Sequence, residues 1–378
     1  MKILHLADLH IGKKVNGFNM LEDQRYALEQ IIGLIKREGV EAVIIAGDVY
    51  DVPVPAGEAM EVFEDLLLDI NELEIPVLVI PGNHDSIERV SFGNRFFERS
   101  RIYIADKYRG QVERVSLEDS HGPINFYLLP YLRPASVKRY FPDEEIRTYQ
   151  DALAHVLGAI DLDSNERNVI VAHQFIVGAQ LGDSEEIYLG DQEAVSLDLF
   201  TAFDYIALGH IHKRQGFLNG KAVYPGALLK YGKREAGHDK TLTLVDIREK
   251  GDIEVIEKRI DYLRDMRIIK GAFAKVVENS KVDPKFDDYI HMVLTDEDEV
   301  SDAINRLRDL YPNIMTLAYE NKRTSEEKSL EDLRDFDEKS PLTMFEHFYE
   351  FRNNAKLSPD KEKLIKEIID EVWGNESH

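Results

Sequence analysis

The feature that most constrains the fold is a series of short apolar segments, each of which runs directly into residue types that bind metals. Val, Ile and Leu dominate these segments, and their short length is typical of buried β-strands. Between the first three of them, apolar residues recur at helical spacing over 23–37 and 59–73. Strands that alternate with helices predict an α/β core with parallel strands. The five predicted strands are 2–7, 41–46, 75–81, 168–172 and 204–208.

Clusters of Asp, Asn and His follow the last residue of every predicted strand. In an extended chain residues i and i+2 face the same side, so Asp8 with His10, and His210 with His212, can converge on one point. Open α/β sheets bind ligands at the carboxyl ends of their strands, and all five clusters are therefore expected to meet there. The clusters are Asp8-Leu9-His10, Gly47-Asp48-Val49-Tyr50-Asp51, Gly82-Asn83-His84-Asp85, His173 and Gly209-His210-Ile211-His212.

Metal binding explains this crowding better than packing does. One isolated Asp-x-His is more often a packing or surface pair, but seven polar side chains in one crevice are costly to bury without an ion. The sequence has no Cys, and four imidazoles favour manganese, iron or zinc over magnesium or calcium. Seven ligands suit two ions that share a carboxylate, the usual arrangement for attack on phosphorus. The candidate ligands are Asp8, His10, Asp48, Asn83, His173, His210 and His212.

The ordered motifs resemble those of the calcineurin-like metallophosphoesterase superfamily, over roughly residues 1–245. The resemblance implies an α/β fold in which a two-sheet sandwich is flanked by helices, and it makes Asp48 the bridge between two ions. It further implies that His84 contacts the substrate phosphate or protonates the leaving oxygen, and we expect Asp51 to orient His84. By the same resemblance, one ion is held by Asp8, His10 and His212 and the other by Asn83, His173 and His210.

Within that superfamily, the residues around the motifs resemble the SbcD nuclease subunits, which pair with an SbcC ATPase. This resemblance implies Mn²⁺-dependent hydrolysis of DNA in repair and recombination, as a 3′–5′ double-strand exonuclease and a single-strand endonuclease that opens hairpins. It also implies a homodimer, whose surface is expected at 91–97 unless the aromatic residues there belong to the core. The resembling stretches are 3–5, 46–51, 81–86, 204–212 and 224–226.

Sequence patterns divide the chain into four parts, of which the first, 1–262, is the metallophosphoesterase domain. Residues 263–320 read strand, strand, helix, strand, with the helix at 300–311, and resemble the α+β DNA-capping domain of the same nucleases. In 321–340, 12 of 20 residues are charged, which predicts a linker or a solvated helix. Two Ser-Pro helix starts with apolar stripes predict a helical hairpin over 341–378. The hairpin either packs on the main domain or, by resemblance, docks the ATPase partner.

The net charge of −24, from 47 basic and 71 acidic residues, is unlike that of a stand-alone DNA-binding protein. A local basic patch, the metals or a partner must then attract DNA. The sequence shows neither a signal peptide nor an apolar run that could span a bilayer, so we expect a cytoplasmic protein without membrane contact. The candidate basic patch, for which a solvated loop is the equal alternative, contains Lys213, Arg214, Lys230, Lys233 and Arg234.

Two other classes of function remain open. A small-molecule phosphodiesterase or phosphatase could use the same site, but it would not need the residues after 260. A non-catalytic scaffold should have lost ligands, whereas none of the seven is missing. Protein serine/threonine phosphatases follow the Asp51 position with Arg-Gly, and here Val52-Pro53 follow, which weakens a phosphoprotein interpretation.

Overall fold

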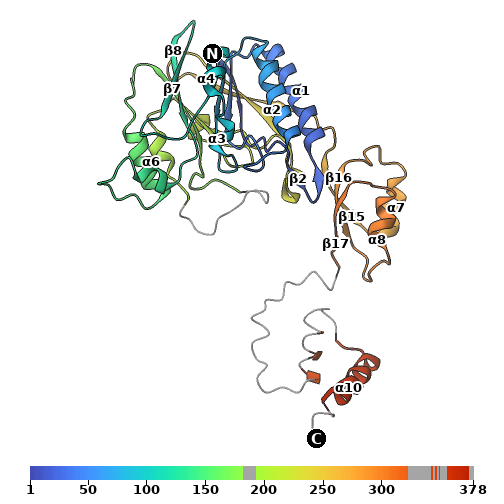
Figure 1. Ribbon diagram of the computed structural model, residues 1–378. Helices are drawn as coiled ribbons and strands as arrows, with labels where there is room; N and C mark the ends of the chain where they lie inside the picture. The colour runs from blue at the N-terminus through green and yellow to red at the C-terminus, as the bar shows by residue number, and fades with distance from the viewer. Residues whose placement is uncertain (182–192, 322–341, 344, 347–348, 350–355, 374–378) are drawn as a thin grey trace. The chain divides into compact units, whose positions relative to one another are not determined.

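The computed structural model describes residues 1–181, 193–321, 342–343, 345–346, 349 and 356–373. The chain groups into two compact units, 1–266 and 267–378 (Figure 1). The boundary lies a few residues after the one expected from the sequence at 262.

The first unit is a sandwich of two six-stranded sheets. In spatial order, the first sheet contains β14 (Ile253–Arg259), β13 (Thr241–Ile247), β1 (Lys2–Leu6), β4 (Ala42–Ala46), β5 (Val77–Ile80) and β6 (Ile102–Ile104). The second contains β11 (Gln215–Phe217), β12 (Ala222–Tyr224), β10 (Tyr205–Gly209), β9 (Arg167–His173), β8 (Gly122–Leu129) and β7 (Glu113–Asp119). Four neighbouring strands of each sheet run parallel. Antiparallel pairing adds β13 and β14 at one edge of the first sheet, and β11 and β7 at the two edges of the second.

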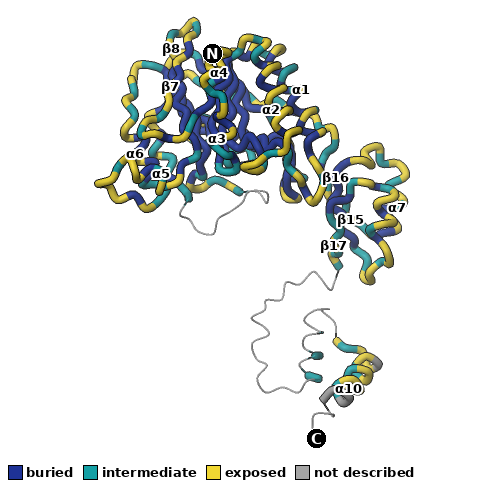
Figure 2. The backbone as a smooth tube through the Cα atoms, viewed as in Figure 1, coloured by how far each residue is buried: buried dark blue, intermediate teal, exposed yellow. Residues whose placement is uncertain are grey.

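Apolar side chains from both sheets fill the space between them. Ile3 and Ile44 of the first sheet and Phe126 and Val169 of the second belong to one cluster of fully buried residues. In Figure 2 the strands of the sandwich are buried, whereas the helices present exposed residues to the outside. Strands that are covered on both faces read as continuous Val, Ile and Leu runs, which explains why all five predicted strands are confirmed to within a few residues.

Helices cover the outer faces of the sandwich. The first sheet carries α1 (Leu21–Glu38) and α2 (Gly57–Asn71), which confirm the two helices predicted from apolar spacing (Figure 1). Gly39 ends α1 in the left-handed conformation that suits glycine. The second sheet carries α5 (Pro134–Lys138) and α6 (Tyr149–Gly158), and a Thr148–Asp151 capping box begins α6.

Short elements connect these layers. Among them, α4 is part of the segment 91–97, and its aromatic residues are not core: Phe92 is 81% exposed and Phe96 is 75% exposed. The core interpretation of these two side chains is therefore wrong. The short elements are β2 (Lys14–Val15), β3 (Phe18–Asn19), α3 (Ile87–Val90), α4 (Asn94–Phe97), and the 3-10 helices η1 (Glu98–Ser100), η2 (Leu197–Phe200), η3 (Leu218–Gly220) and η4 (Lys233–Gly237).

The second unit contains a three-stranded sheet with two helices. The order is β15 (Met266–Gly271), β16 (Tyr289–Leu294), β17 (Ile314–Tyr319), and the helices are α7 (Phe273–Ser280) and α8 (Ala303–Arg308). Helix α7 is absent from the prediction, because it has only two buried apolar positions and contains Val276 and Val277, a residue type typical of strands. The prediction also made α8 too long, since the expected helix at 300–311 is regular only over its centre.

The predicted linker, 321–340, lies outside the described residues except for Asn321. Of the predicted hairpin, the second helix is described as α10 (Pro359–Trp373), while only residues 342–343, 345–346 and 349 of the first are described, and these are helical. On α10, Leu364 is 55% exposed and Ile368 is 45% exposed.

The packing predicts that two Phe→Ala substitutions will lower the free energy of unfolding by different amounts. Phe126→Ala should lower the free energy of unfolding of the first unit by about 3–5 kcal/mol, because it opens a cavity between the sheets. The matched variant Phe286→Ala removes the same atoms from a side chain that is 52% exposed and should change the free energy of unfolding by about 0.5 kcal/mol or less. Urea unfolding followed by circular dichroism measures both, and equal losses would contradict the assignment of Phe126 to the core.

Candidate metal centre

All five motif clusters follow strand ends at one corner of the sandwich. Three of them follow β1, β4 and β5 in the first sheet, and two lie at the ends of β9 and β10 in the second. The seven candidate ligands therefore come from both sheets. Hydrogen bonds join the two halves: the backbone N–H of His210 donates to Asp8 Oδ1 over 2.9 Å, and His173 Nδ1 lies 2.8 Å from the carbonyl of Ala46.

The structure places Asp8, His10 and His212 in one buried group, with ligand atoms within 4.8 Å of one another. The two Nε2 atoms of His10 and His212 lie 2.9 Å apart. Burial lowers the pKa of both imidazoles, so they are neutral and each has a lone pair for a cation. A cation between the two nitrogens would satisfy both lone pairs.

A second group surrounds the Asn83 amide. Its Oδ1 lies 3.0 Å from His173 Nε2 and 3.0 Å from His210 Nδ1. Asp48 lies between the two groups, with Oδ2 3.3 Å from His173 Nε2 and 3.6 Å from His10 Nε2. This set of imidazole nitrogens and carboxylate and amide oxygens fits a pair of divalent ions that share Asp48.

Several candidate ligands adopt backbone conformations that most side chains avoid. Asp8, His10 and Asp48 have φ angles of 53°, 46° and 51°, in the left-handed region, and His210 has a φ of 106°. Such conformations persist only where surrounding contacts fix them, and they cluster at functional sites. Gly82 is required for a related reason, because a Cβ atom there would collide with the Asp48 carboxylate.

The expected pairing of Asp51 with His84 differs from what the structure contains. His84 Nδ1 lies 3.0 Å from the backbone carbonyl of Asp51, so any residue at 51 offers that acceptor. The Asp51 carboxylate instead accepts a 2.5 Å hydrogen bond from Lys13 Nζ and lies 3.4 Å from His10 Nδ1. The expectation that this carboxylate orients His84 is therefore wrong: it faces the imidazole of a candidate ligand.

Asp85 has a role that the sequence interpretation missed. Its buried carboxylate accepts hydrogen bonds from the backbone N–H groups of Val49, Tyr50 and Gly82, at 2.9 to 3.0 Å. Burial, and then the charge of Asp48, raises the pKa of Asp85 to about 6. Asp85 thus ties the loop after β4 to the loop after β5. Its place at the end of the Gly-Asn-His-Asp motif was the available signal.

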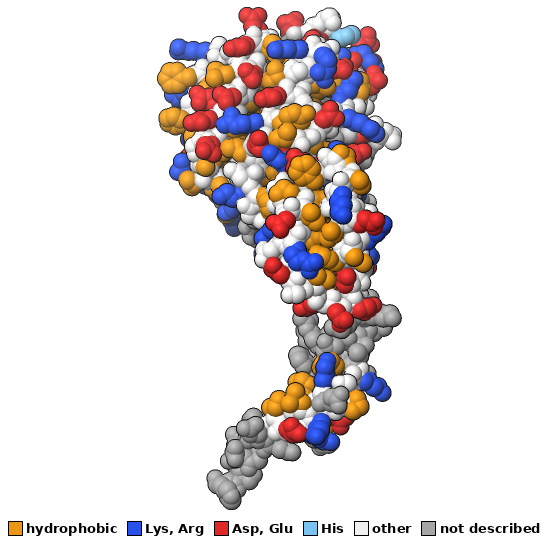
Figure 3. All heavy atoms as spheres, turned by 90° about the vertical axis from the view of Figure 1, so that its right-hand side faces the viewer, with side chains coloured by type: hydrophobic (Ala, Val, Ile, Leu, Met, Phe, Trp, Pro, Cys, Tyr) orange, Lys and Arg blue, Asp and Glu red, His pale blue; other side chains and the backbone are white. Residues whose placement is uncertain are grey.

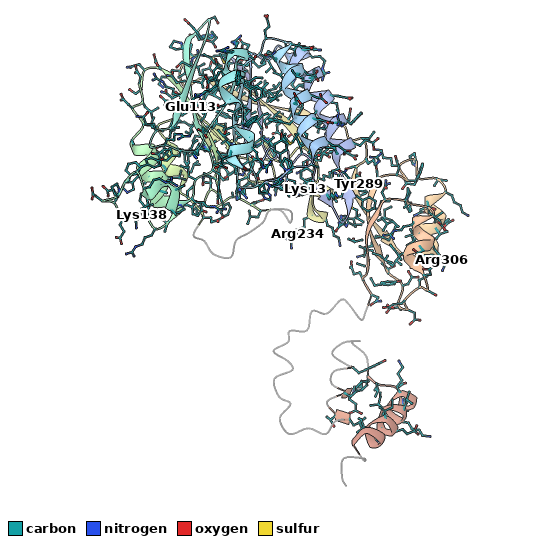
Figure 4. All side chains as sticks on the ribbon, viewed as in Figure 1. Lys13, Glu113, Lys138, Arg234, Tyr289 and Arg306 are labelled. Atoms are coloured by element: carbon teal, nitrogen blue, oxygen red, sulfur yellow. The ribbon has the colours of Figure 1, made fainter. Side chains whose placement is uncertain are left out.

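The candidate basic patch is only partly exposed. Lys230 is 5% exposed and pairs with Asp265 over 2.7 Å, so its ammonium does not face solvent. Arg214 pairs with Glu257 over 3.0 Å, and Lys213 donates to the Gln180 side chain. Lys233 and Arg234 are exposed, and Arg234 lies with Lys13 along the lower edge of the first unit in Figure 4. On the face drawn in Figure 3, basic and acidic side chains are interspersed.

Comparison with known proteins agrees with this geometry. The calcineurin-like phosphoesterase family matches residues 1–214. The chain belongs to this family. A second family, described as the type 5 capsule protein repressor C-terminal domain, matches residues 262–353. The SbcD subunit of the SbcCD nuclease of Staphylococcus epidermidis is 32% identical over 381 residues, which cover 100% of both chains.

Two solved structures also match. One is a protein of Thermus thermophilus, with 14% identity and a TM-score of 0.40 over 68% of this chain and 98% of that one. The other is a dimetal phosphatase from Danio rerio, with 10% identity and a TM-score of 0.40 over 70% of this chain and 98% of that one. These scores are too low to add to the family assignment. Among the described residues, no helix has the length and apolar character that a membrane span requires.

The sequence matches discriminate between the functions left open. A small-molecule phosphodiesterase of the same family would not need the second matched domain, and the alignment with the nuclease subunit extends over both matched regions of this chain. The alternative of a small-molecule enzyme is therefore not favoured. A scaffold is not favoured either, because all seven candidate ligands are present and converge.

The position of Asp51 predicts how its replacement will act. Asp51→Asn should weaken binding of one metal ion by about 10–100-fold, because a carboxylate beside the far nitrogen of a ligating imidazole orients it and raises its basicity.

His84→Ala should leave metal affinity unchanged and lower turnover by about two orders of magnitude or more. Calorimetric titration with Mn²⁺ and phosphodiester hydrolysis measure the two effects. If Asp51→Asn reproduces the behaviour of His84→Ala, the carboxylate acts through His84 after all.

Proposed function

We propose that this protein is the nuclease subunit of an SbcCD-type complex and hydrolyses DNA phosphodiester bonds with two divalent metal ions. The observation that supports this most is the convergence of seven nitrogen and oxygen ligands from both sheets, in a chain that matches a nuclease subunit over its full length. The proposed activities are 3′–5′ double-strand exonuclease, single-strand endonuclease and hairpin opening. We place them in DNA repair and recombination in the cytoplasm.

We propose that one ion is held by Asp8, His10 and His212 and the other by Asn83, His173 and His210, with Asp48 shared between them. We propose Mn²⁺ for both ions, which when bound would polarise the phosphate and supply an activated water. The protein's own contribution includes the orientation of His84. Donation from Nδ1–H to the Asp51 carbonyl leaves Nε2 as the atom that meets the substrate. In the imidazolium form Nε2–H can donate to a phosphate oxygen or pass its proton to the leaving oxygen, which returns the ring to its neutral form.

Two surfaces support the proposed partners. We propose that Phe92 and Phe96 contact a second copy of this chain, since exposed aromatic residues so close together are costly to leave in water. Leu364 and Ile368 on α10 are proposed to dock an SbcC-like ATPase. Of the candidate DNA contacts, the exposed Lys233 and Arg234 remain the better supported, followed by the partly exposed Lys213 and Arg214.

Replacement of the shared carboxylate tests the chemistry. Asp48→Asn should abolish manganese-dependent degradation of linear duplex DNA, because it weakens the hold on both ions while the nearly isosteric side chain preserves the fold. Activity is compared on duplex DNA and on a small phosphodiester, with circular dichroism as the control for folding. Retained metal-dependent activity in this variant would refute the two-metal assignment. Wild-type protein that cleaves only the small substrate would refute the nuclease proposal.

Removal of the C-terminal segment tests the docking proposal. Deletion of residues 340–378 should leave hydrolysis of a small phosphodiester intact, because every proposed ligand precedes residue 213. Binding to the ATPase, and with it ATP-dependent attack on long duplex DNA, should be lost. The point variant Leu364→Glu with Ile368→Glu keeps the segment and should also lose binding. Co-purification of either variant with the ATPase at full yield would contradict the docking role.

A further inference from the structure

A buried amide and a buried phenol lie directly behind the Asp8-x-His10 motif. Gln24 projects from α1 and is fully buried, and Tyr231 is buried in the segment between β12 and η4. Neither belongs to the five motif clusters. Both are more than ten residues away from Asp8 and His10 in sequence, so only the fold brings them together.

Their contacts form one closed network. The Tyr231 hydroxyl donates to the Leu9 carbonyl over 2.7 Å and accepts from Gln24 Nε2 over 2.9 Å. Gln24 Nε2 also donates to the His10 carbonyl over 2.8 Å, and its Oε1 accepts from the Gly12 N–H over 2.9 Å. The Leu9 carbonyl also lies 3.2 Å from the same nitrogen, so the two amide hydrogens are shared among three acceptors. The orientation of the Gln24 amide is therefore fixed, because only its nitrogen can serve a carbonyl.

This network holds a segment whose backbone is strained. Asp8 and His10 both have left-handed φ angles, which non-glycine residues keep only where several contacts fix them. On one side, their N–H groups donate to the carbonyls of Gly47 and Asp48 over 3.1 and 3.0 Å. On the other side, the carbonyls of Leu9 and His10 accept from Tyr231 and Gln24.

The Tyr231 ring also packs against two proposed ligands of the same ion. Its centroid lies 5.9 Å from that of His10, with the planes at 88°, and 6.1 Å from that of His212. A displacement of this ring would therefore move the imidazoles whose Nε2 atoms lie 2.9 Å apart.

We propose that Gln24 and Tyr231 are positioning residues that hold the Asp8 and His10 side chains in place and so set the affinity of the site for the ion shared by Asp8, His10 and His212. The inference rests on the proposed two-metal function. It concerns metal loading and not contact with the substrate. Residues behind a metal ligand typically contribute about 10–100-fold to metal affinity, which is large enough to measure.

Two conservative variants and one matched control test the proposal. Tyr231→Phe removes only the hydroxyl, and Gln24→Glu keeps the shape and the acceptor for Gly12 but cannot donate to the His10 carbonyl. Tyr205→Phe is the control, because Tyr205 is a fully buried phenol whose hydroxyl contacts His5 Nδ1 over 2.9 Å, and His5 belongs to none of the five motif clusters. Calorimetric titration of each full-length protein with Mn²⁺ gives the affinity for each ion, and urea unfolding gives stability.

Tyr231→Phe and Gln24→Glu should each lower the affinity for one ion by about 10–100-fold and leave the other ion nearly unaffected. Tyr205→Phe should lose stability without a change in either affinity. Wild-type metal affinities in both Tyr231→Phe and Gln24→Glu would overturn the proposal. An equal loss of metal affinity in Tyr205→Phe would overturn it as well. Because no nucleic acid enters the titration, failure of the nuclease proposal would appear separately, as wild-type protein that binds two ions but does not cleave DNA.

Discussion

The buried Asp48 carboxylate is the group on which the rest of the site depends. It projects from the end of β4 in the first sheet and meets His173 from β9 in the second and His10 from β1. Burial alone would raise its pKa, but the charge and the hydrogen bond of His173 outweigh burial and hold the pKa well below its usual range. A buried carboxylate without such partners is costly, so the two sheets must meet at this corner with their strand ends aligned.

The ligands at the aligned strand ends have strained backbone conformations. Asp8, His10 and Asp48 all have left-handed φ angles. The side chains of His10 and Asp48 meet those of His212 and His173, which come from strand ends of the second sheet. Each turn is fixed by hydrogen bonds from outside its own loop: Asp85 holds the loop after β4, and Gln24 with Tyr231 holds the loop after β1. Helix α1, on the outer face of the first sheet, thus contributes to this network through Gln24.

The features that depend on local pattern can be predicted from the sequence. The parallel strands follow from continuous apolar runs, and the ligand clusters follow from their place after those runs. Contacts that depend on the three-dimensional arrangement cannot be predicted in this way. Spacing in the sequence does not show that His84 meets the backbone carbonyl of Asp51 and not its carboxylate. Lys230 looked like a surface cation because its partner, Asp265, lies 35 residues away. The sequence does not indicate that Gln24 is buried behind the motif, since one polar residue on a helix is ordinarily solvated.

The ion pairs near the metal centre bear on how so acidic a chain could attract DNA. Several cations near the metal centre are already neutralised, with Lys13 on Asp51, Arg214 on Glu257 and Lys240 on Glu235. Each of these three cations therefore has an acidic partner beside a site proposed to hold a polyanion. Two divalent ions would bring four positive charges to that corner, so metal loading would govern DNA binding as well as hydrolysis. Beyond the corner, a net charge of −24 makes a partner's basic surface the natural source of longer-range attraction for DNA.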